Sequence, residues 1–166
     1  MKTLVVVDHN NNKLEKSTLN TIKAALTLEN VDLLVLSDNC KDICNELMNI
    51  KNINNIFVNE NDAFKYQLAE DTANFIAQNF KDYSNILFSS SSNGKNIAPR
   101  LAGLLNTMII PDVIEIVDKQ TFKRPIYAGN AIATCKSKNI INILTIRATA
   151  FEEAEIGNEN IGKIKE

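Results

Sequence analysis

A serine-rich segment with a glycine and a lysine carries the residue types most able to hold a phosphate. It follows a short apolar run and opens a helical pattern, and backbone N–H groups at a helix start bind anions. It is not a full P-loop, because Ser89 stands where the first glycine belongs and Asn96 replaces the hydroxyl that holds magnesium. Two interpretations stay open: a nucleotide phosphate site, or a helix start whose serines cap backbone donors, and we favour the second. The segment consists of Ser91, Ser92, Asn93, Gly94 and Lys95.

The other reactive side chains form no recognisable catalytic or metal-binding set. His9 is the single histidine, and without a Ser, Cys or carboxylate partner in view it is interpreted as a loop or packing residue rather than a base. Cys40 and Cys44 stand four apart on one face of an expected helix. A metal pair is conceivable there, but no second cysteine pair exists, so we expect buried structural thiols and no metal. With Cys135 the count is odd, which suits a reducing compartment.

A guanidinium, a phenol and a carboxamide lie close together in the second half of the chain. They belong to Arg124, Tyr127 and Asn130. Arg and Tyr often anchor interfaces, because each combines apolar area with directed hydrogen bonds. Pro125 fixes the backbone nearby, and Gly129 permits a turn that would strain a branched residue. The segment therefore indicates a rigid hairpin for docking a partner, or alternatively a strand pair that closes a sheet edge.

The elements that must position these side chains alternate between strands and helices in the first half. Short apolar runs typical of buried parallel strands occur at Leu4–Val7, Val31–Leu36, Ile53–Val58 and Ile86–Phe88. Helical stripes lie between or after them, at Leu19–Leu26 with a cap at Ser17 or Thr18, Cys40–Met48, Phe64–Ile76 with a cap at Asp62, and Ile97–Leu105 after Asn93-Gly94, with Pro99 in the first turn. This order predicts right-handed crossovers and a three-layer α/β sandwich. A ligand is expected where strand order reverses, at the loops Asp8–Asn12 and Ser89–Lys95.

The second half predicts strands with short links, added to the parallel core as an antiparallel β-meander. The expected strands are Val113–Val117, Thr121–Tyr127, Ala131–Lys136 and Ile140–Ile146, with hairpin turns at Asp118–Gln120 and Ser137–Asn139. The residues after Phe151 are polar and are expected to form a solvated linker. We therefore predict one α/β domain over residues 1–151 and a linker over residues 152–166.

Composition excludes several classes of function. The 166 residues are 45% hydrophobic and 23% charged, which suits one globular domain. A net charge of −2 argues against nucleic-acid binding. No apolar run approaches the roughly 20 residues of a membrane span, and Met1–Asp8 is interpreted as a first strand rather than a signal peptide. We expect a bacterial cytoplasmic location or an organelle matrix.

Five segments in order resemble the α subunit of electron transfer flavoprotein. The most specific is Arg124–Ala131, with the sequence Arg-Pro-Ile-Tyr-Ala-Gly-Asn-Ala. The others are Leu19–Thr21, Gly94–Asn96 with Pro99-Arg100, Asp112–Ile116 and Arg147–Phe151. Together they cover the chain from Leu4 to about Glu155, which makes the resemblance much stronger than any one match.

The resemblance implies a redox scaffold without catalytic residues of its own, hence an electron carrier subunit rather than an enzyme. The fold would be of the adenine nucleotide alpha hydrolase type. In the family an αβ heterodimer holds one FAD, accepts electrons from acyl-CoA dehydrogenases of fatty acid β-oxidation and other dehydrogenases, and passes them to a membrane quinone oxidoreductase. This chain would be the amino-terminal domain, which packs against the β subunit, in a bacterial cytoplasm or a mitochondrial matrix. The FAD-binding carboxy-terminal domain is absent from it, so we expect no FAD on this chain alone.

The resemblance also assigns partner contacts to particular residues. Docking to the β subunit or to the missing FAD domain would involve Arg124, Pro125, Tyr127, Gly129 and Asn130, and the junction between the two domains would involve Arg147 and Phe151. Because the AMP of the family belongs to the β subunit, the serine segment is again better explained as a helix cap. The alternatives are a small nucleotide-binding α/β protein of the universal-stress or ATP-pyrophosphatase type, and a free-standing interaction module.

Overall fold

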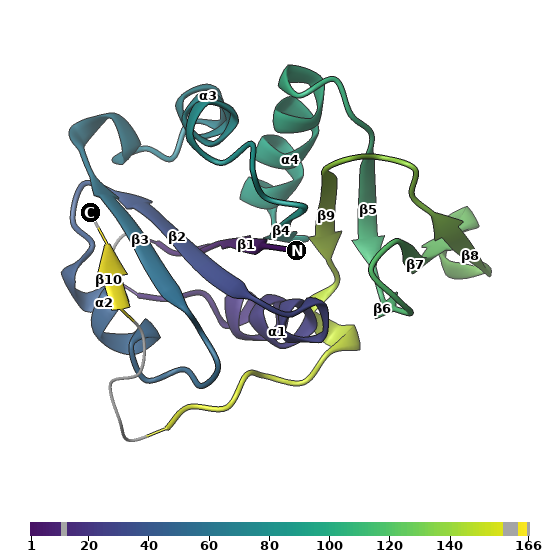
Figure 1. Cartoon of the computed structure of the whole chain (residues 1–166), viewed down its shortest axis with the longest axis horizontal. Coiled ribbons are helices and arrows are strands. Elements are labelled where there is room, and N and C mark those ends of the chain that lie inside the picture. The colour runs from purple at the N-terminus through teal and green to yellow at the C-terminus, as the bar shows by residue number, and fades with distance from the viewer. Residues whose placement is uncertain (11–12, 158–162, 166) are drawn as a thin grey trace.

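The computed structural model describes residues 1–10, 13–157 and 163–165 and shows a parallel sheet between two layers of helices (Figure 1). The seven strands of this main sheet lie in the order β10 (Lys163–Lys165), β3 (Asn55–Glu60), β2 (Val31–Ser37), β1 (Thr3–Val6), β4 (Asn85–Ser89), β9 (Asn142–Ile146) and β5 (Ile109–Val113). Every neighbouring pair is parallel. The expected α/β class with a parallel core is confirmed.

Helices cover both faces of the main sheet, each over its own hydrophobic core. On one face lie α1 (Lys16–Ala25), followed by the 3-10 turn η1 (Leu26–Leu28), and α2 (Lys41–Leu47). On the other lie α3 (Ala69–Asn79) and α4 (Ser92–Leu104). Successive side chains of a strand point to opposite faces, so Val5 of β1 packs under α1 and α2, whereas Leu4 and Val6 pack under α3 and α4. Within the described residues no helix is long and apolar enough to cross a membrane.

Helix α1 lacks the expected side-chain cap and is instead hydrogen-bonded to the chain just after β1. Its N-cap is Glu15, which makes no side-chain capping bond. Thr18, one of the two expected caps, is buried instead. Its Oγ1 accepts a hydrogen bond from the Asp8 amide at 3.0 Å and donates one to the Asp8 carbonyl at 2.9 Å. This residue therefore fixes the chain where β1 ends and the first loop begins.

The third helical stripe is divided into two elements. Asn61, rather than the expected Asp62, caps a short 3-10 turn, η2 (Asp62–Phe64), and α3 begins only at Ala69. Gln67 between them has φ +50°, a left-handed backbone that a continuous helix does not allow. The break matters because it directs the Gln67 side chain toward the end of β1, as described below.

The fourth helix begins with a serine cap and contains a proline in its interior. Ser91 is the N-cap, and its Oγ accepts a hydrogen bond from the Gly94 amide at 3.1 Å. Pro99 lies inside α4, and the expectation that it sits in the first turn is wrong because the helix starts at Ser92. A proline at this position removes one intrahelical hydrogen bond.

The antiparallel strands form a separate sheet, and the expected meander on the main sheet is wrong in this respect. The last strand of the meander is expected at residues 140–146, but residues 142–146 instead form β9, which lies in the main sheet between β4 and β5 and is parallel to both. The five residues of β9 are all buried, as for a strand covered on both faces. Ser137–Asn139 is accordingly a connection back into the main sheet and not a hairpin turn. Asn139 Nδ2 donates to the Met108 carbonyl at 3.0 Å in this connection.

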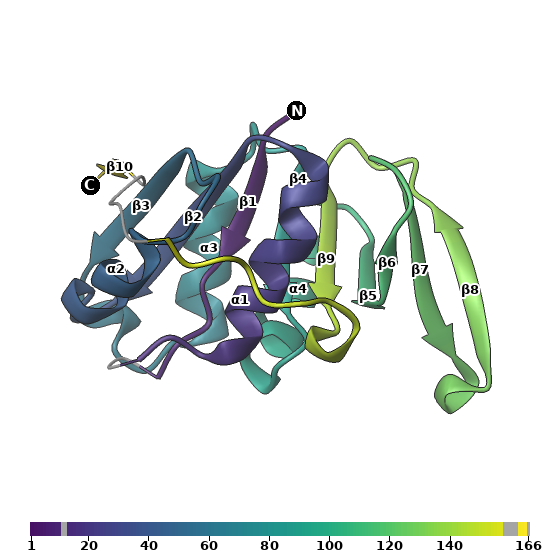
Figure 2. The ribbon, with the colours of Figure 1, turned by 90° about the horizontal axis from the view of Figure 1, so that it is seen from below.

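The separate sheet projects from the β5 side of the molecule (Figure 2), and we call it the arm. It consists of β6 (Glu115–Ile116), β7 (Thr121–Ile126), the turn η3 (Tyr127–Gly129) and β8 (Ala131–Lys136). The pairs β6·β7 and β7·β8 are antiparallel, so the expected hairpin turn at Asp118–Gln120 is confirmed. Phe122 anchors the arm, because its ring is fully buried in the core beneath α1 and α2.

Residues 152–157 lie against the domain, and we call them the strap. The turn η4 (Ala148–Ala150) leads into it. Glu152 and Glu153 are exposed, as expected of a linker, but Ala154 is buried and its amide donates to the Leu19 carbonyl at 3.1 Å. The backbone amide of Lys51 also donates to the Glu155 carbonyl at 3.2 Å. A fully solvated linker is therefore the wrong description of the strap, whereas the domain boundary at residue 151 stays a prediction, and residues 158–162 and 166 lie outside the described residues.

Candidate functional site

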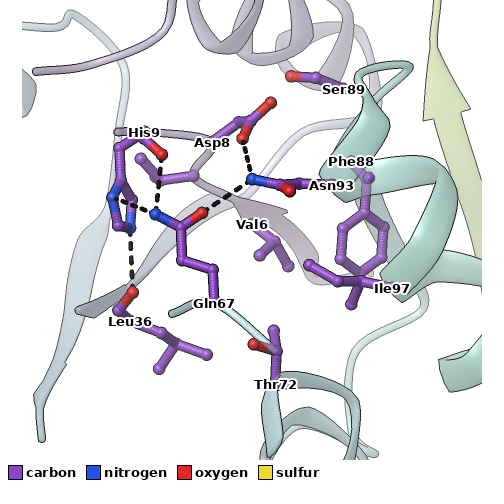
Figure 3. A pocket seen from close by; sticks show the side chains of 12 residues that line it. Val6, Asp8, His9, Leu36, Gln67, Thr72, Phe88, Ser89, Asn93 and Ile97 are labelled. Atoms are coloured by element: carbon purple, nitrogen blue, oxygen red, sulfur yellow. Dashed lines mark hydrogen bonds between the residues drawn. The ribbon is translucent and has the colours of Figure 1, made fainter. Parts of the chain in front are cut away.

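The crevice between the ends of β1 and β4 is the first candidate site. From β1 the chain proceeds to β2 and β3 on one side, and β4 lies on the other side, so strand order reverses here. Open parallel sheets bind ligands at the carboxyl ends of the strands at such a point. The crevice lies between the two loops that the sequence indicated, and Figure 3 shows its lining side chains.

The crevice is filled by a network of the chain's own polar side chains (Figure 3). Gln67 Nε2 donates to the His9 carbonyl at 2.9 Å and lies 3.2 Å from His9 Nδ1. Its Oε1 accepts from Asn93 Nδ2 at 2.9 Å, and the same nitrogen lies 3.5 Å from Asp8 Oδ1. The remaining cavity has a volume of about 30 Å³, which is roughly the space of one water molecule. A nucleotide would have to displace the Gln67 side chain.

His9 is a buried part of this network, in keeping with the packing role expected for it. Its Nε2 lies 3.0 Å from the Leu36 carbonyl. Because a carbonyl only accepts, this geometry places the proton on Nε2 and leaves Nδ1 to accept from Gln67. Burial lowers the pKa of His9 below 6.5, outweighing the opposite effects of the Leu36 carbonyl, Asp8 and Asp38. The imidazole is thus held neutral.

Serine side chains of this segment form hydrogen bonds that fix the start of α4. Ser91 caps the helix, and Ser90 Oγ donates to Thr145 Oγ1 at 3.0 Å. A Cβ on Gly94 would lie 1.9 Å from the Ser89 carbonyl oxygen, so the glycine is explained by close packing of α4 on the end of β4. Ser92, Asn93 and Lys95 have exposed side chains. The capping interpretation accounts for these contacts, and a phosphate site here stays a prediction.

A second, open cavity of about 370 Å³ lies beside this segment, and we call it the Arg147 pocket. Arg147 Nη2 donates to Asp112 Oδ2, and this hydrogen bond lowers the pKa of the Asp112 carboxyl despite its partial burial. Within the described residues no carboxylate lies within 4.0 Å of the Lys95 ammonium. The structure thus brings the serine segment and the expected domain junction together. The lining residues are Ser17, Ser90, Ser91, Lys95, Asp112, Arg147, Ala148 and Thr149.

The junction residue Phe151 is attached to α1. Its ring packs against the core beneath α1 and α2, and its carbonyl accepts from Asn20 Nδ2 at 2.7 Å. Asn20 and Phe151 belong to two of the segments that carry the family resemblance. Their contact fixes the point at which the strap begins.

The arm displays the expected partner residues in two different ways. Arg124 is held on the inner side, because its Nε donates to the Pro111 carbonyl at 2.8 Å. Tyr127 is 79% exposed at the tip, where Tyr127, Ala128 and Gly129 all have positive φ. Such a backbone is strained for the two residues that carry a Cβ, and Asn130 follows it.

The outer face of the arm is exposed and partly apolar. Pro125 pairs with Ile132 across β7 and β8, and Ile132 is 61% exposed. Lys123 and Thr134 form the neighbouring pair on the same face. β8 is an edge strand of the arm, so its outward backbone groups are not paired within that sheet. Unpaired edges and exposed apolar side chains together are typical of association surfaces.

The cysteines pack as expected for structural thiols. Cys40 and Cys44 are buried, and desolvation raises the pKa of Cys40 to about 12. Thiols with raised pKa values are poor nucleophiles and poor metal ligands. Over the described residues no group of three or more His, Cys, Asp or Glu side chains is arranged to hold a metal ion.

The sequence pattern does not predict that Gln67 and Asp8 lie in the same crevice. Asp8 begins the expected loop Asp8–Asn12, but nothing in the residue pattern links it to Gln67, 59 positions later. The left-handed backbone at Gln67 is the decisive feature, and no glycine or asparagine marks it in the sequence.

Comparisons with known proteins agree with the resemblance seen in the sequence. A family model described as "Electron transfer flavoprotein domain" matches residues 3–166. The electron transfer flavoprotein subunit alpha of Pseudomonas aeruginosa is 39% identical over 153 residues, covering 92% of this chain and 50% of that protein. The mitochondrial subunit alpha of Dictyostelium discoideum is 38% identical over 160 residues, covering 91% and 45%. The Paracoccus denitrificans subunit alpha is 35% identical over 158 residues, covering 95% and 51%. The chain spans about half the length of these relatives.

Proposed function

Because this chain belongs to the electron transfer flavoprotein domain family, we propose that it is the amino-terminal domain of an α subunit and serves as a scaffold in a heterodimer with a β subunit. One observation carries the proposal: the crevice where this architecture would bind a nucleotide is filled by Gln67, His9 and Asn93. With no room there for a cofactor, the contribution of the domain lies in its surface.

The arm is the proposed contact surface for the β subunit. Tyr127 supplies an exposed aromatic anchor at the tip, and Pro125 and Ile132 supply apolar area on the outer face. Arg124 braces the arm against β5 through the Pro111 carbonyl, and Gly129 and Asn130 complete the tip. Preorganised aromatic side chains lose little entropy on binding, which favours them as interface anchors.

The FAD of the complex is held mainly outside this chain, in the part of the α subunit that the chain does not span. In this proposal Arg147 and Phe151 lie at the junction with that part, beside the strap. The complex carries electrons from acyl-CoA and other dehydrogenases to a membrane quinone oxidoreductase. The domain takes part by positioning the flavin-bearing parts rather than by catalysing a step of its own. The relatives include bacterial and mitochondrial proteins, and a bacterial cytoplasm or a mitochondrial matrix is proposed accordingly.

The first experiment measures binding of a purified β subunit by calorimetry. Tyr127→Ala should weaken the complex about tenfold, since a central aromatic anchor typically contributes 1–2 kcal/mol or more. Tyr66→Ala is the matched control, because Tyr66 is equally exposed, at 77%, but lies outside the arm. Equal losses in the two variants, or no complex with the unaltered chain, would refute the interface.

The second experiment tests the location of the cofactor. The chain purified alone should show no flavin absorbance and should bind neither AMP nor ATP at micromolar concentration, because the crevice has room for about one water. Stoichiometric flavin in the purified chain would overturn the assignment of FAD to other parts of the complex. Micromolar nucleotide binding would instead revive the nucleotide-binding alternative, which the comparisons do not favour.

A further inference from the structure

An aromatic pocket on the face covered by α3 and α4 has no part in the proposed scaffold. Its volume is about 470 Å³, which is within the range of small-molecule sites. It lies where α3 ends at Asn79, and its floor includes the buried Leu34 and the partly exposed Phe57 of the sheet. β10 lies beside β3 on its outer side (Figure 1). The lining residues are Lys2, Leu34, Phe57, Val58, Asn59, Phe75, Asn79, Phe80, Asp82, Tyr83 and Lys165.

The walls of the pocket are aromatic rings held in fixed positions. Phe80 contacts three other rings, with centroid distances of 5.5 Å to Phe57, 6.2 Å to Phe75 and 5.6 Å to Tyr83. Tyr83 is held further by its hydroxyl, which donates to Asp32 Oδ2 at 2.6 Å, and burial raises its pKa. The rings are inclined to one another by 52–78°, so they form an apolar wall of edges and faces, and their fixed positions lower the entropic cost of binding.

Two ammonium groups define the charge of the opening. Lys2 Nζ lies 5.7 Å from the centroid of the Tyr83 ring, and Lys165 Nζ lies 5.6 Å from that of Phe57. Among the described residues no carboxylate lies within 4.0 Å of either ammonium. Among the described residues that line the pocket, Asp82 is the one carboxylate, so these residues carry an excess of positive charge.

We propose that this pocket binds a small planar aromatic carboxylate, with its ring system against the wall formed by Phe57, Phe80 and Tyr83 and its carboxylate between Lys2 and Lys165. The aromatic wall selects an apolar body, and the two ammonium groups select a negative charge at one end. An uncharged aromatic molecule would gain the ring contacts but not the ion pairs. The site lies away from the arm and from the filled crevice, so it can be tested independently of the scaffold proposal.

The test titrates the isotope-labelled chain with 2-naphthoate and follows its amide signals by NMR. Binding should produce saturable shifts at Lys2, Phe57 and Tyr83. The uncharged analogue 2-naphthamide should bind about tenfold more weakly, and the double variant Lys2→Gln/Lys165→Gln should bind 2-naphthoate more weakly by a similar factor, as expected for two partly exposed charge contacts.

A matched control removes the same charge elsewhere. Lys16 and Lys41 are exposed and lie on helices of the opposite face of the sheet, so Lys16→Gln/Lys41→Gln should leave the affinity within about twofold. All four substitutions are at exposed or rim positions, and each variant is checked for an unchanged amide spectrum. Shifts that map elsewhere, equal binding of the amide and the carboxylate, or equal losses in both double variants would overturn the proposal.

Discussion

The Gln67 side chain connects three segments of the chain that are distant in sequence. It contacts His9 after β1 and Asn93 at the start of α4, while its own backbone lies between η2 and α3. Its left-handed φ places the amide where a ligand would otherwise enter. A crevice that is a binding site in an open parallel sheet is therefore a closed polar junction here, and its hydrogen bonds contribute to stability.

The titration of His9 gives a test of this junction. Burial lowers its pKa from 6.5, so the unfolded chain binds a proton at higher pH than the native chain does. Stability is then fully present above about pH 6.5 and falls as pH drops toward the native pKa, with a slope approaching roughly 1.4 kcal/mol per pH unit. Urea denaturation between about pH 7 and pH 5 should show this loss.

The single histidine makes the assignment direct. His9→Gln removes the titrating group, and the free energy of unfolding of this variant should change less over the same pH range. Carboxylates titrate lower and contribute equally to both proteins. Parallel pH profiles for the two proteins would show that a group other than His9 is responsible.

Helix α4 allows a comparison of two glycines within one element. A Cβ at Gly94 would lie 1.9 Å from the Ser89 carbonyl oxygen, whereas nothing lies within 4 Å of a Cβ at Gly103. Gly94→Ala should therefore lower the free energy of unfolding by about 3 kcal/mol through overpacking. Gly103→Ala should raise it by about 0.5 kcal/mol, because alanine favours the helix. Thermal and urea unfolding of both variants check the opposite signs, and a loss at Gly103 as large as that at Gly94 would exclude the packing explanation.

The strap offers a second matched pair at the level of elements. Ala154 is buried and its amide donates to α1, whereas Ala150 is exposed in η4, four residues before it. Ala154→Glu should destabilise the chain by about 2–4 kcal/mol, because it forces a charge into the core or detaches the strap. Ala150→Glu should change stability by less than about 0.5 kcal/mol. Urea denaturation distinguishes the two, and equal effects would mean that the strap is not packed in solution.

The sequence predicts elements whose residue pattern is local, but it does not predict features that depend on contacts between distant residues. The apolar runs at Leu4–Val7 and Val31–Leu36 predict the parallel strands, and the interpretation of the serine segment as a helix cap agrees with the observed cap at Ser91. The run Ile140–Ile146 is expected in the antiparallel meander because the link before it is short, although a continuous apolar run is typical of a buried parallel strand. The positions of Gln67 and Phe122 depend on tertiary contacts that no sequence periodicity records.

The molecule as a whole has one compact body and one projecting part (Figure 2). The filled crevice, the two cores and the strap belong to the body. The Phe122 ring and the bond from Arg124 to the Pro111 carbonyl attach the arm to the body, together with an ion pair between Lys119 and Glu29 and a hydrogen bond from Asn142 Nδ2 to the Lys119 carbonyl. This division matches the proposed function, because a rigid body with an exposed β-edge is suited to holding a partner subunit in a fixed orientation.

The two outer edge strands of the molecule should differ in how their hydrogen exchange changes when the β subunit binds. β8 is an edge of the arm and β10 is the edge of the main sheet on the opposite side. If the arm binds the β subunit, hydrogen exchange at residues 131–136 should slow at least about tenfold in the complex, since the amides there lose access to water. Exchange at residues 163–165 should stay unchanged and serves as the internal control. Protection at β10 without protection at β8 would move the interface to the other side of the sheet and leave the arm without its proposed role.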